Sequence, residues 1–275
     1  MQEKSIPCSV LVLTRNAAAT LERCLRNLRP FAEVLVHDGN SEDDTVALAK
    51  RYGARVLKQY DTDEPGVRVK DFTEIRLKQR ADAANDWVLY LDADEFLSDE
   101  LVREIGAILN NAHEKTIIKF PRLPVVEGRI IRHGAFWPEV MPRVHHRRGG
   151  CTLRSGKVIH EKYVYDASFT VITARSPLYV PMDPIADLLQ KDDRYIAYEV
   201  QRLREQSGGR RPWRRYIQWF LLREPLVMFH VILRIAWDRL HHGCRDALPF
   251  RYEWRIVRYH ARLFTVVTRL MIIAW

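Results

Sequence analysis

The chain has 275 residues, 47% of them hydrophobic and 29% charged, so it is long enough to bury a large core and its composition excludes wholesale disorder. Its formal net charge of +9 leaves an anionic partner open, whether a nucleic acid or an acidic membrane surface. The four cysteines form neither a C-x-x-C pair nor a zinc-type spacing, which argues against a disulfide framework and a structural zinc site and favours a reducing compartment.

Strands and helices alternate in the first 120 residues. Leucine-rich and β-branched runs predict buried strands, and apolar residues at helical spacing predict the helices between them. The expected strands cover residues 8–13, 33–36, 54–57, 87–91 and 116–120, and the expected helices cover 17–28, 43–52, 71–84 and 99–110. This alternation predicts an α/β fold with a mostly parallel, doubly wound sheet flanked by helices.

The pattern loosens after Pro121 into a stretch rich in Gly, Arg and His. Strand-like pieces are expected at 126–131, 157–159 and 167–173, followed by an amphipathic helix at 187–206 that Ser207-Gly208-Gly209 ends. We therefore expect one α/β domain over residues 1–207, made of a first half at 1–120 and a second at 121–207. A separate helical segment is expected at 208–275.

The segment 208–275 is strongly basic. It carries 13 Arg, no Lys and four acidic residues, a net charge of +9 that equals that of the whole chain. Its longest uncharged runs, 225–233 and 270–275, are far shorter than the ~20 residues of a membrane-spanning helix. Arginines interleaved with aromatic residues are typical of amphipathic helices that lie on anionic lipid. The alternative is a helical cap packed on the sheet.

Two of the predicted strands end on carboxylates. The strand at 87–91 is followed by Asp92, Asp94 and Glu95, and the strand at 33–36 by His37 and Asp38. Ligands of open α/β sheets bind at the carboxyl ends of the strands, and carboxylate oxygens suit Mg²⁺ or Mn²⁺ together with substrate phosphates. The alternative is that these acids lie in a solvated loop or in the first turn of a helix.

Four motifs in chain order resemble those of the family 2 glycosyltransferases, inverting enzymes with the Rossmann-like GT-A fold. They are Thr14-Arg15-Asn16 after the first strand, then Asp38, Ser41, Asp43 and Thr45, then Arg76, and finally Asp86-Trp87-Val88-Leu89-Tyr90-Leu91-Asp92-Ala93-Asp94-Glu95. The resemblance implies a nucleotide-diphosphate sugar donor. It assigns the donor to Thr14, Asn16, Asp38, Ser41, Asp43, Arg76 and Asp92. It assigns a divalent cation, Mn or Mg, to Asp94 with Asp92 and His160.

Later motifs are similar to those of the branch that builds the lipopolysaccharide core. They are His133-Gly134-Ala135-Phe136-Trp137-Pro138-Glu139, then Arg143, then Ile159-His160-Glu161. The resemblance implies that Trp137 and Arg143 bind the acceptor. The base that takes the acceptor proton is expected to be Glu161, with Glu139 as the alternative.

Several of these residues also have plain structural interpretations. Asn16 could cap a helix and Asp43 could lie at a helix start. Arg76 could pair with an acid on the exposed face of its helix, and Trp137 could belong to the core. These alternatives stay open at the level of the sequence.

We therefore expect a metal-dependent inverting glycosyltransferase that acts on a lipid-linked or lipopolysaccharide-type acceptor. No secretory signal precedes the first strand, so we expect a cytoplasmic protein, peripheral on the inner face of the membrane and bound to its anionic surface. One alternative is a sugar-phosphate nucleotidyltransferase, but residues 14–19 lack a Gly-rich phosphate loop. The other is a non-enzymatic binder of nucleic acid or membrane. Nucleic acid is disfavoured because the C-terminal arginines lie among large aliphatic residues.

Overall fold

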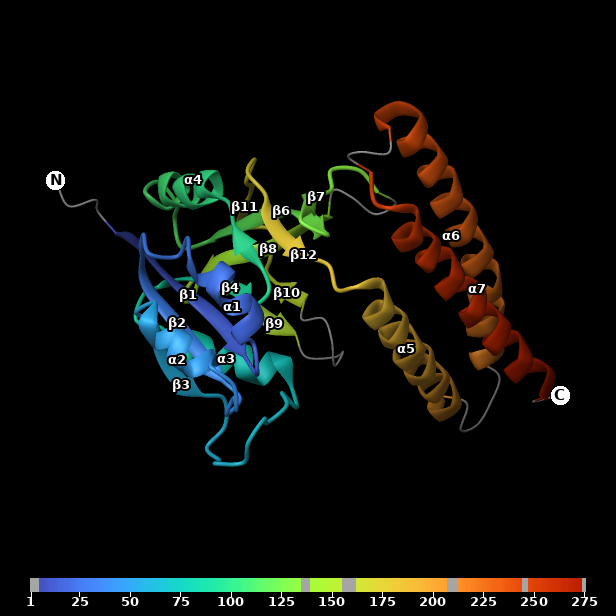
Figure 1. Ribbon diagram of the computed structural model, residues 1–275, viewed down its shortest axis with the longest axis horizontal. Helices are drawn as coiled ribbons and strands as arrows, with labels where there is room; N and C mark the ends of the chain where they lie inside the picture. The colour runs from blue at the N-terminus through green and yellow to red at the C-terminus, as the bar shows by residue number, and fades with distance from the viewer. Residues whose placement is uncertain (1–4, 135–138, 155–161, 207–211, 244–246, 274–275) are drawn as a thin grey trace. The chain divides into compact units, whose positions relative to one another are not determined.

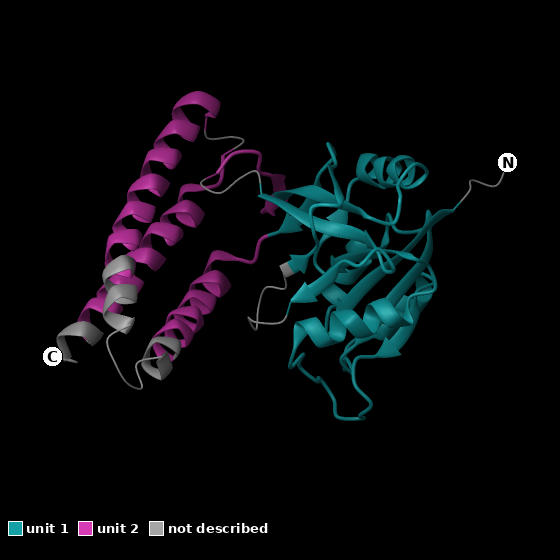
Figure 2. Cartoon of the chain, turned by 180° about the vertical axis from the view of Figure 1, so that it is seen from behind, with its two compact units in different colours: residues 1–123, 139–181 teal, residues 124–138, 182–275 magenta. Residues whose placement is uncertain are grey.

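The computed structural model describes residues 5–134, 139–154, 162–206, 212–243 and 247–273. The chain divides into two compact units, shown in different colours in Figure 2. Unit 1 comprises residues 1–123 and 139–181, and unit 2 comprises residues 124–138 and 182–275. The helix expected at 187–206 thus belongs to the same unit as the basic C-terminal segment.

Unit 1 starts with the predicted alternation of strands and helices (Figure 1). Its first elements are β1 (Ile6–Thr14), α1 (Ala18–Leu25), β2 (Phe31–Asp38), α2 (Thr45–Arg51), β3 (Arg55–Lys58), α3 (Phe72–Asp82), β4 (Trp87–Asp92), β5 (Phe96–Leu97), α4 (Asp99–Leu109) and β6 (Thr116–Val126), whose residues from 124 onward belong to unit 2. The remaining strands of the unit are β8 (Glu139–His146), β9 (Thr152–Arg154), β10 (Lys162–Val164), β11 (Thr170–Thr173) and β12 (Leu178–Pro181).

The main sheet is mixed but mostly parallel at its N-terminal side. Its strand order is β3-β2-β1-β4-β8-β6-β12-β5, and β9 and β10 form a separate antiparallel pair. β3, β2, β1 and β4 are parallel, whereas β8 runs antiparallel to both β4 and β6. With its flanking helices this sheet confirms the predicted fold class.

The register of the parallel strands brings the predicted carboxylates to one edge. Thr14 at the end of β1 pairs with Asp38 at the end of β2, and Leu13 pairs with Asp92 at the end of β4. The carboxyl ends of three adjacent strands therefore lie side by side. Asp38 and Asp92 flank the end of β1 from its two sides.

Both faces of the parallel sheet are covered, so its strands are apolar on both sides. Val10 and Leu89 belong to a core shared with Leu25 of α1 and Ile105 of α4. Leu11 and Val88 face the opposite way, because side chains alternate along a strand, and belong to a smaller core with Leu153 of β9. Two packed faces fix the strands whose ends form the edge described above.

Some elements differ from the sequence-based expectation. β8 was not predicted, because its Arg143, His145 and His146 are polar although all three are buried in the sheet. In the run at 126–131, Val126 ends β6 and the two residues Arg129–Ile130 form the short strand β7. The strand expected at 157–159 lies outside the described residues.

Unit 2 contains α5 (Ile185–Gln206), α6 (Pro212–His242) and α7 (Phe250–Ile273). Val231 and Ile235 of α6 pack against Val257 of α7, while Phe220 of α6 packs with Leu263 of α7 and Ile196 of α5. Within the part of the chain that the structure describes, none of the helices has an apolar stretch of the length needed to cross a membrane.

Candidate active site

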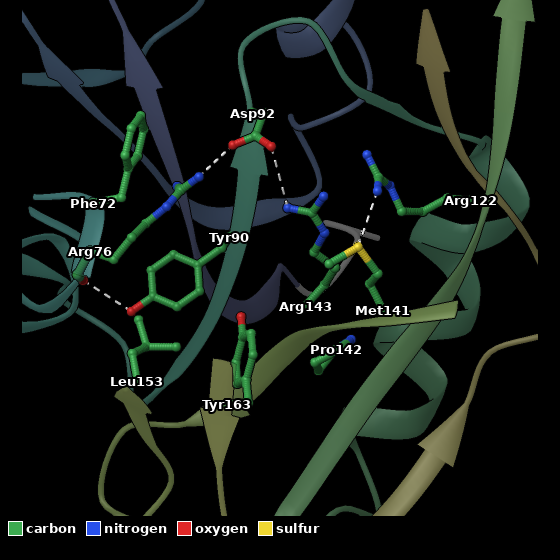
Figure 3. A pocket seen from close by; sticks show the side chains of 10 residues that line it. All are labelled: Phe72, Arg76, Tyr90, Asp92, Arg122, Met141, Pro142, Arg143, Leu153 and Tyr163. Carbon is green, nitrogen blue, oxygen red and sulfur yellow. Dashed lines mark hydrogen bonds and ion pairs between the residues drawn. The ribbon is translucent and has the colours of Figure 1, made fainter. Parts of the chain in front are cut away.

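A pocket of about 220 Å³ opens in unit 1 at the carboxyl end of β4 (Figure 3). Its walls come from α3, β4, β6, β8, β9 and β10. The lining residues are Phe72, Arg76, Tyr90, Asp92, Arg122, Met141, Pro142, Arg143, Leu153 and Tyr163. Three arginines around one aspartate give this pocket a positive balance of charge, which suits an anionic ligand.

Asp92 lies between two guanidinium groups (Figure 3). One carboxylate oxygen accepts a hydrogen bond from Nη2 of Arg76, and the other lies 3.7 Å from Nη1 of Arg143. Burial opposes the negative charge, but the two arginines outweigh it and hold the pKa of Asp92 below its usual value. The Asp92 side chain is nevertheless 45% exposed, so an ionised carboxylate faces the pocket.

Arg76 lies on the buried face of α3. Asp71 caps this helix by accepting a hydrogen bond from the Thr73 amide at 2.7 Å, which fixes where the helix begins. The Arg76 guanidinium lies 5.2 Å from the centre of the Tyr90 ring, and the Tyr90 hydroxyl donates to the Arg76 carbonyl at 3.0 Å. The alternative interpretation of the sequence was that Arg76 pairs with an acid on the exposed face of its helix. Arg76 does form an ion pair, but its partner is Asp92 and the pair lies in the pocket.

Glu95 is a site residue to which sequence reasoning gave no role. Its side chain is 1% exposed and accepts hydrogen bonds from Nη2 of Arg143 at 2.6 Å and Nη2 of Arg122 at 3.2 Å. Burial raises the pKa of Glu95 to about 7 although both arginines favour the charged form. Glu95 therefore anchors two of the pocket's three arginines from behind. The only sequence signal was its place directly after Asp94.

Asp38 is almost fully buried and engaged within the protein. One carboxylate oxygen accepts from the Thr14 hydroxyl at 2.7 Å and from the Ser41 hydroxyl at 2.6 Å, and the other accepts from the Ser41 amide at 2.7 Å. These bonds hold the loop after β2 against the end of β1. Asp38 thus shapes the edge next to the pocket.

The loops after β1 and β2 are tied together by further predicted residues. The backbone amide of Asn16 donates to the Ser41 hydroxyl at 2.8 Å, and the side-chain oxygen of Asn16 accepts from the backbone amide of Glu42 at 2.9 Å. Asp43 accepts from the Ala18 amide at 3.1 Å, near the start of α1. Asn16 has a φ of 49°, in the left-handed region that asparagine tolerates better than most residues. The structure therefore gathers these residues at one edge.

The structure describes two of the three residues predicted to hold a metal. Asp94 is exposed in the turn after β4, and Asp92, which ends that strand, lines the pocket. Among the described residues the two aspartates form no three-ligand group with another His, Cys, Asp or Glu, and the predicted His160 lies outside the described residues. One or two carboxylates with substrate phosphate oxygens fit Mg²⁺ or Mn²⁺ and do not fit a closed structural site.

The structure describes only one of the two candidate bases and one of the two predicted acceptor residues. Glu139 at the start of β8 is about half exposed and accepts from Nη1 of Arg122 at 2.9 Å, so it is linked to the pocket through that arginine. Arg143 lines the pocket, where it contacts Asp92 and Glu95. Glu161 and Trp137 lie outside the described residues.

His145 of β8 lies behind the pocket and is fully buried. Its ring lies 5.5 Å from the rings of Tyr90 and Tyr163, and neither ring nitrogen has a hydrogen-bond partner in the part of the chain that the structure describes. Burial lowers the pKa of His145 to about 3. His145 is therefore neutral at physiological pH and acts as an aromatic spacer.

We expect His145→Phe to make the protein more resistant to acid. In the wild type the unfolded chain binds a proton at His145 below about pH 6.5 but the folded protein does not until about pH 3, so stability falls as the pH drops through this window. The loss approaches about 1.4 kcal/mol per pH unit. Urea denaturation at pH 7, 5.5 and 4.5 should show a smaller loss in the variant.

The control for this prediction is Val171→Ala, a change at a 42% exposed side chain that carries no titratable group. It should keep the pH dependence of the wild type, because it removes no group that binds protons. Equal pH dependence in the wild type and His145→Phe would mean that His145 is protonated in the folded protein, contrary to its burial.

Comparison with known proteins places the geometry in context. The model of the family described as glycosyl transferase family 2 matches residues 9–155. The chain is 34% identical over 113 residues to an uncharacterized glycosyltransferase of Rickettsia felis, a match that covers 41% of this chain and 37% of that protein. The chain thus spans little more than a third of the length of this relative.

Two further similarities are more extended. The chain is 25% identical over 219 residues to the lipopolysaccharide core biosynthesis glycosyltransferase LpsC of Rhizobium meliloti, covering 75% of this chain and 74% of LpsC. The crystal structure of S. aureus TarS 1–349 in complex with UDP-GlcNAc is 18% identical with a TM-score of 0.45, covering 64% of this chain and 59% of that one.

Proposed function

The chain belongs to glycosyl transferase family 2, and on that premise we propose that it moves a sugar from a nucleotide-diphosphate donor to an acceptor hydroxyl with inversion at the sugar carbon. The observation that carries this proposal is the ionised Asp92 between Arg76 and Arg143, in a pocket at the same sheet edge as Asp38. We place the donor within residues 1–120, the acceptor within 121–207 and membrane contact within 208–275.

The described residues give the donor pocket two properties that the reaction needs. Arg122 and Arg143 present guanidinium N–H groups of fixed geometry to the pocket, and these match the phosphate oxygens of the donor diphosphate or of a phosphorylated acceptor. Asp92 is held ionised, so it can accept a hydrogen bond from a ribose hydroxyl or provide a metal ligand. When bound to Asp94, with Asp92 and His160, a Mn or Mg ion would supply charge neutralisation for the leaving diphosphate.

An inverting transfer also needs a base that removes the proton of the acceptor hydroxyl. We assign this role to Glu161, with Glu139 as the alternative. Glu139 is about half exposed and bonded to Arg122 of the pocket wall, so it is accessible and lies beside the pocket. Trp137 and Arg143 remain our candidates for acceptor contact.

A thermal-shift panel tests the donor proposal. The full chain is melted with nucleoside diphosphates, nucleotide sugars, nucleoside triphosphates and sugar 1-phosphates, each with Mn²⁺, with Mg²⁺ and with EDTA. We expect stabilisation by one nucleoside diphosphate and its sugar conjugate, and only with metal. Stabilisation by a triphosphate and a sugar 1-phosphate instead would favour a nucleotidyltransferase and contradict the proposal.

We further propose a lipid-linked or lipopolysaccharide-type acceptor at the cytoplasmic face of the membrane. The similarity to LpsC over three quarters of the chain supports this acceptor class. So does an exposed apolar stripe along α6, in which each side chain is between 52% and 81% exposed. The stripe consists of Leu222, Leu226, Phe229, Leu233, Trp237 and Leu240. Arg223 follows the stripe residue Leu222 and is exposed, which suits anionic headgroups.

We expect the double substitution Leu226→Ser with Phe229→Ser to weaken binding to anionic vesicles at least tenfold, because two large apolar side chains no longer enter the lipid. Vesicle sedimentation measures this effect. The control is Val171→Ser, at a 42% exposed apolar residue of β11, which should bind as the wild type does. If the double variant binds vesicles equally well, or the stripe instead mediates dimers seen by size exclusion, membrane docking through α6 is wrong.

A further inference from the structure

Three potential metal ligands converge in unit 2, and none of them is among the residues assigned to the donor. They are His133, which follows β7, and Asp238 and His242 near the end of α6. One donor atom from each lies within 4.8 Å of the others. Asp238 and His242 are four residues apart, so they project from the same face of the helix.

The position of His133 is set by backbone contacts that do not depend on any ligand. Its carbonyl accepts a hydrogen bond from the Leu248 amide at 3.0 Å, and it forms a β-bridge with Ala247. Val126 and Ile131 pack in one buried cluster with Leu248 and Tyr252. The segment that carries His133 is therefore already fixed beside α6 and the start of α7.

Asp238 is fully buried, and only half of its carboxylate has a partner. Oδ2 accepts from Nε of Arg234 at 3.1 Å, while Oδ1 has no hydrogen-bond partner among the described residues. Glu253, also fully buried, has the same property, because Oε2 accepts from Arg239 at 3.0 Å and Oε1 has no such partner. Burial, and to a lesser degree the charge of Asp238, raises the pKa of Glu253. A buried carboxylate oxygen without a partner is costly, and a cation would satisfy it.

The two histidines lie next to each other. Their ring centres are 3.7 Å apart with an angle of 2° between the planes, so the rings stack. Because the nitrogen lone pairs lie in the ring planes, one of the two rings must turn before both can bind the same ion. Tetrahedral coordination at the usual metal–nitrogen lengths needs donor atoms roughly 3.4 Å apart. His242 is exposed, so a change of rotamer can bring its nitrogen to that distance while Asp238 stays in place.

We propose that His133, Asp238 and His242 bind a divalent transition-metal ion in unit 2, with water in the remaining position. Two imidazole nitrogens and one carboxylate oxygen favour Zn²⁺, Co²⁺ or Ni²⁺ over Mg²⁺, which prefers oxygen ligands. The ion would tie the segment after β7 to α6. The site shares no residue with the Asp92–Asp94 pair assigned to the donor, so it stands independently of the proposed function.

The test is competition for Zn²⁺ between the full chain and a chromophoric chelator, without nucleotide. We expect one Zn²⁺ per chain in the wild type and at least tenfold weaker binding in His133→Ala and in His242→Ala. His241→Ala is the matched control, because His241 is the neighbouring histidine, stacks on Trp237 and is absent from the ligand group, and it should bind as the wild type does.

Two measurements test whether weaker Zn²⁺ binding arises from misfolding or from loss of a metal at the donor site. Circular dichroism should show the same helix content in His242→Ala as in the wild type, since His242 is exposed. Asp94→Asn should retain Zn²⁺ binding in full. The proposal is overturned if the wild type binds no Zn²⁺ at micromolar concentrations, or if His133→Ala and His242→Ala bind as tightly as His241→Ala.

Discussion

Asp94→Asn should abolish metal-dependent binding of the nucleoside diphosphate and lower sugar transfer by at least about 100-fold, while the protein stays folded. Asp94 is exposed in the turn after β4, so the change removes no core packing. A neutral amide is a much weaker ligand for Mn²⁺ or Mg²⁺ than a carboxylate, and a diphosphate bound without metal keeps its charge uncompensated. Calorimetric titration of nucleoside diphosphate with and without metal measures the binding.

The control for Asp94→Asn is Asp99→Asn, an equally conservative change of an exposed aspartate in the first turn of α4. We expect it to leave binding and transfer within about twofold of the wild type, because Asp99 is not among the residues assigned to the donor or the metal. The protein should also stay folded, since a charge at a helix start contributes only about 0.3–1 kcal/mol to stability. If Asp94→Asn binds the diphosphate with unchanged affinity in the presence of metal, Asp94 is not the metal ligand.

The edge that carries Asp38 and Asp92 was predictable from sequence because two local patterns act together. Apolar runs place the strands, and parallel pairing puts their carboxyl ends at one edge. No long-range information is needed beyond the alternation of strand and helix. The register of β1 with β2 and with β4 confirms this part of the prediction.

The far wall of the pocket was not predictable in the same way. Arg122 and Arg143 come from β6 and β8, which pair antiparallel, and the polar residues of β8 hide its strand character. Their partner Glu95 is buried only because the turn after β4 directs it inward, whereas Asp94 of the same turn is exposed. The conformation of the turn decides which of these two adjacent acids is exposed to solvent. The sequence motif alone does not predict that conformation.

Glu95→Leu should lower the free energy of unfolding by about 3 kcal/mol at pH 8, the loss typical of breaking a buried ion pair by removing one partner. The guanidinium of Arg143 is nearly buried and would lose its 2.6 Å partner, although it keeps the longer contact with Asp92. Arg122 would keep Glu139. Urea denaturation of the variant and the wild type measures the difference.

Glu95→Gln is the matched variant, because the amide keeps the shape and a hydrogen-bond acceptor but carries no charge. We expect little loss at pH 8, below about 1 kcal/mol, because the raised pKa of Glu95 means that its buried charge is itself unfavourable in the folded protein. If Glu95→Leu is as stable as the wild type, the Arg143–Glu95 pair contributes nothing to the free energy of unfolding.

The pH dependence distinguishes a buried acid from a surface ion pair at this position. The folded protein holds a proton on Glu95 up to about pH 7, whereas the unfolded chain releases it near pH 4.5. Between these values the folded state binds more protons, so the contribution of Glu95 to stability falls as the pH rises from 4.5 to 7. Glu95→Gln removes this slope, and its deficit relative to the wild type should therefore be larger at pH 5 than at pH 8. A deficit that instead grows with pH would mean that the two arginines lower the pKa of Glu95 and that the pair is already ionised in acid.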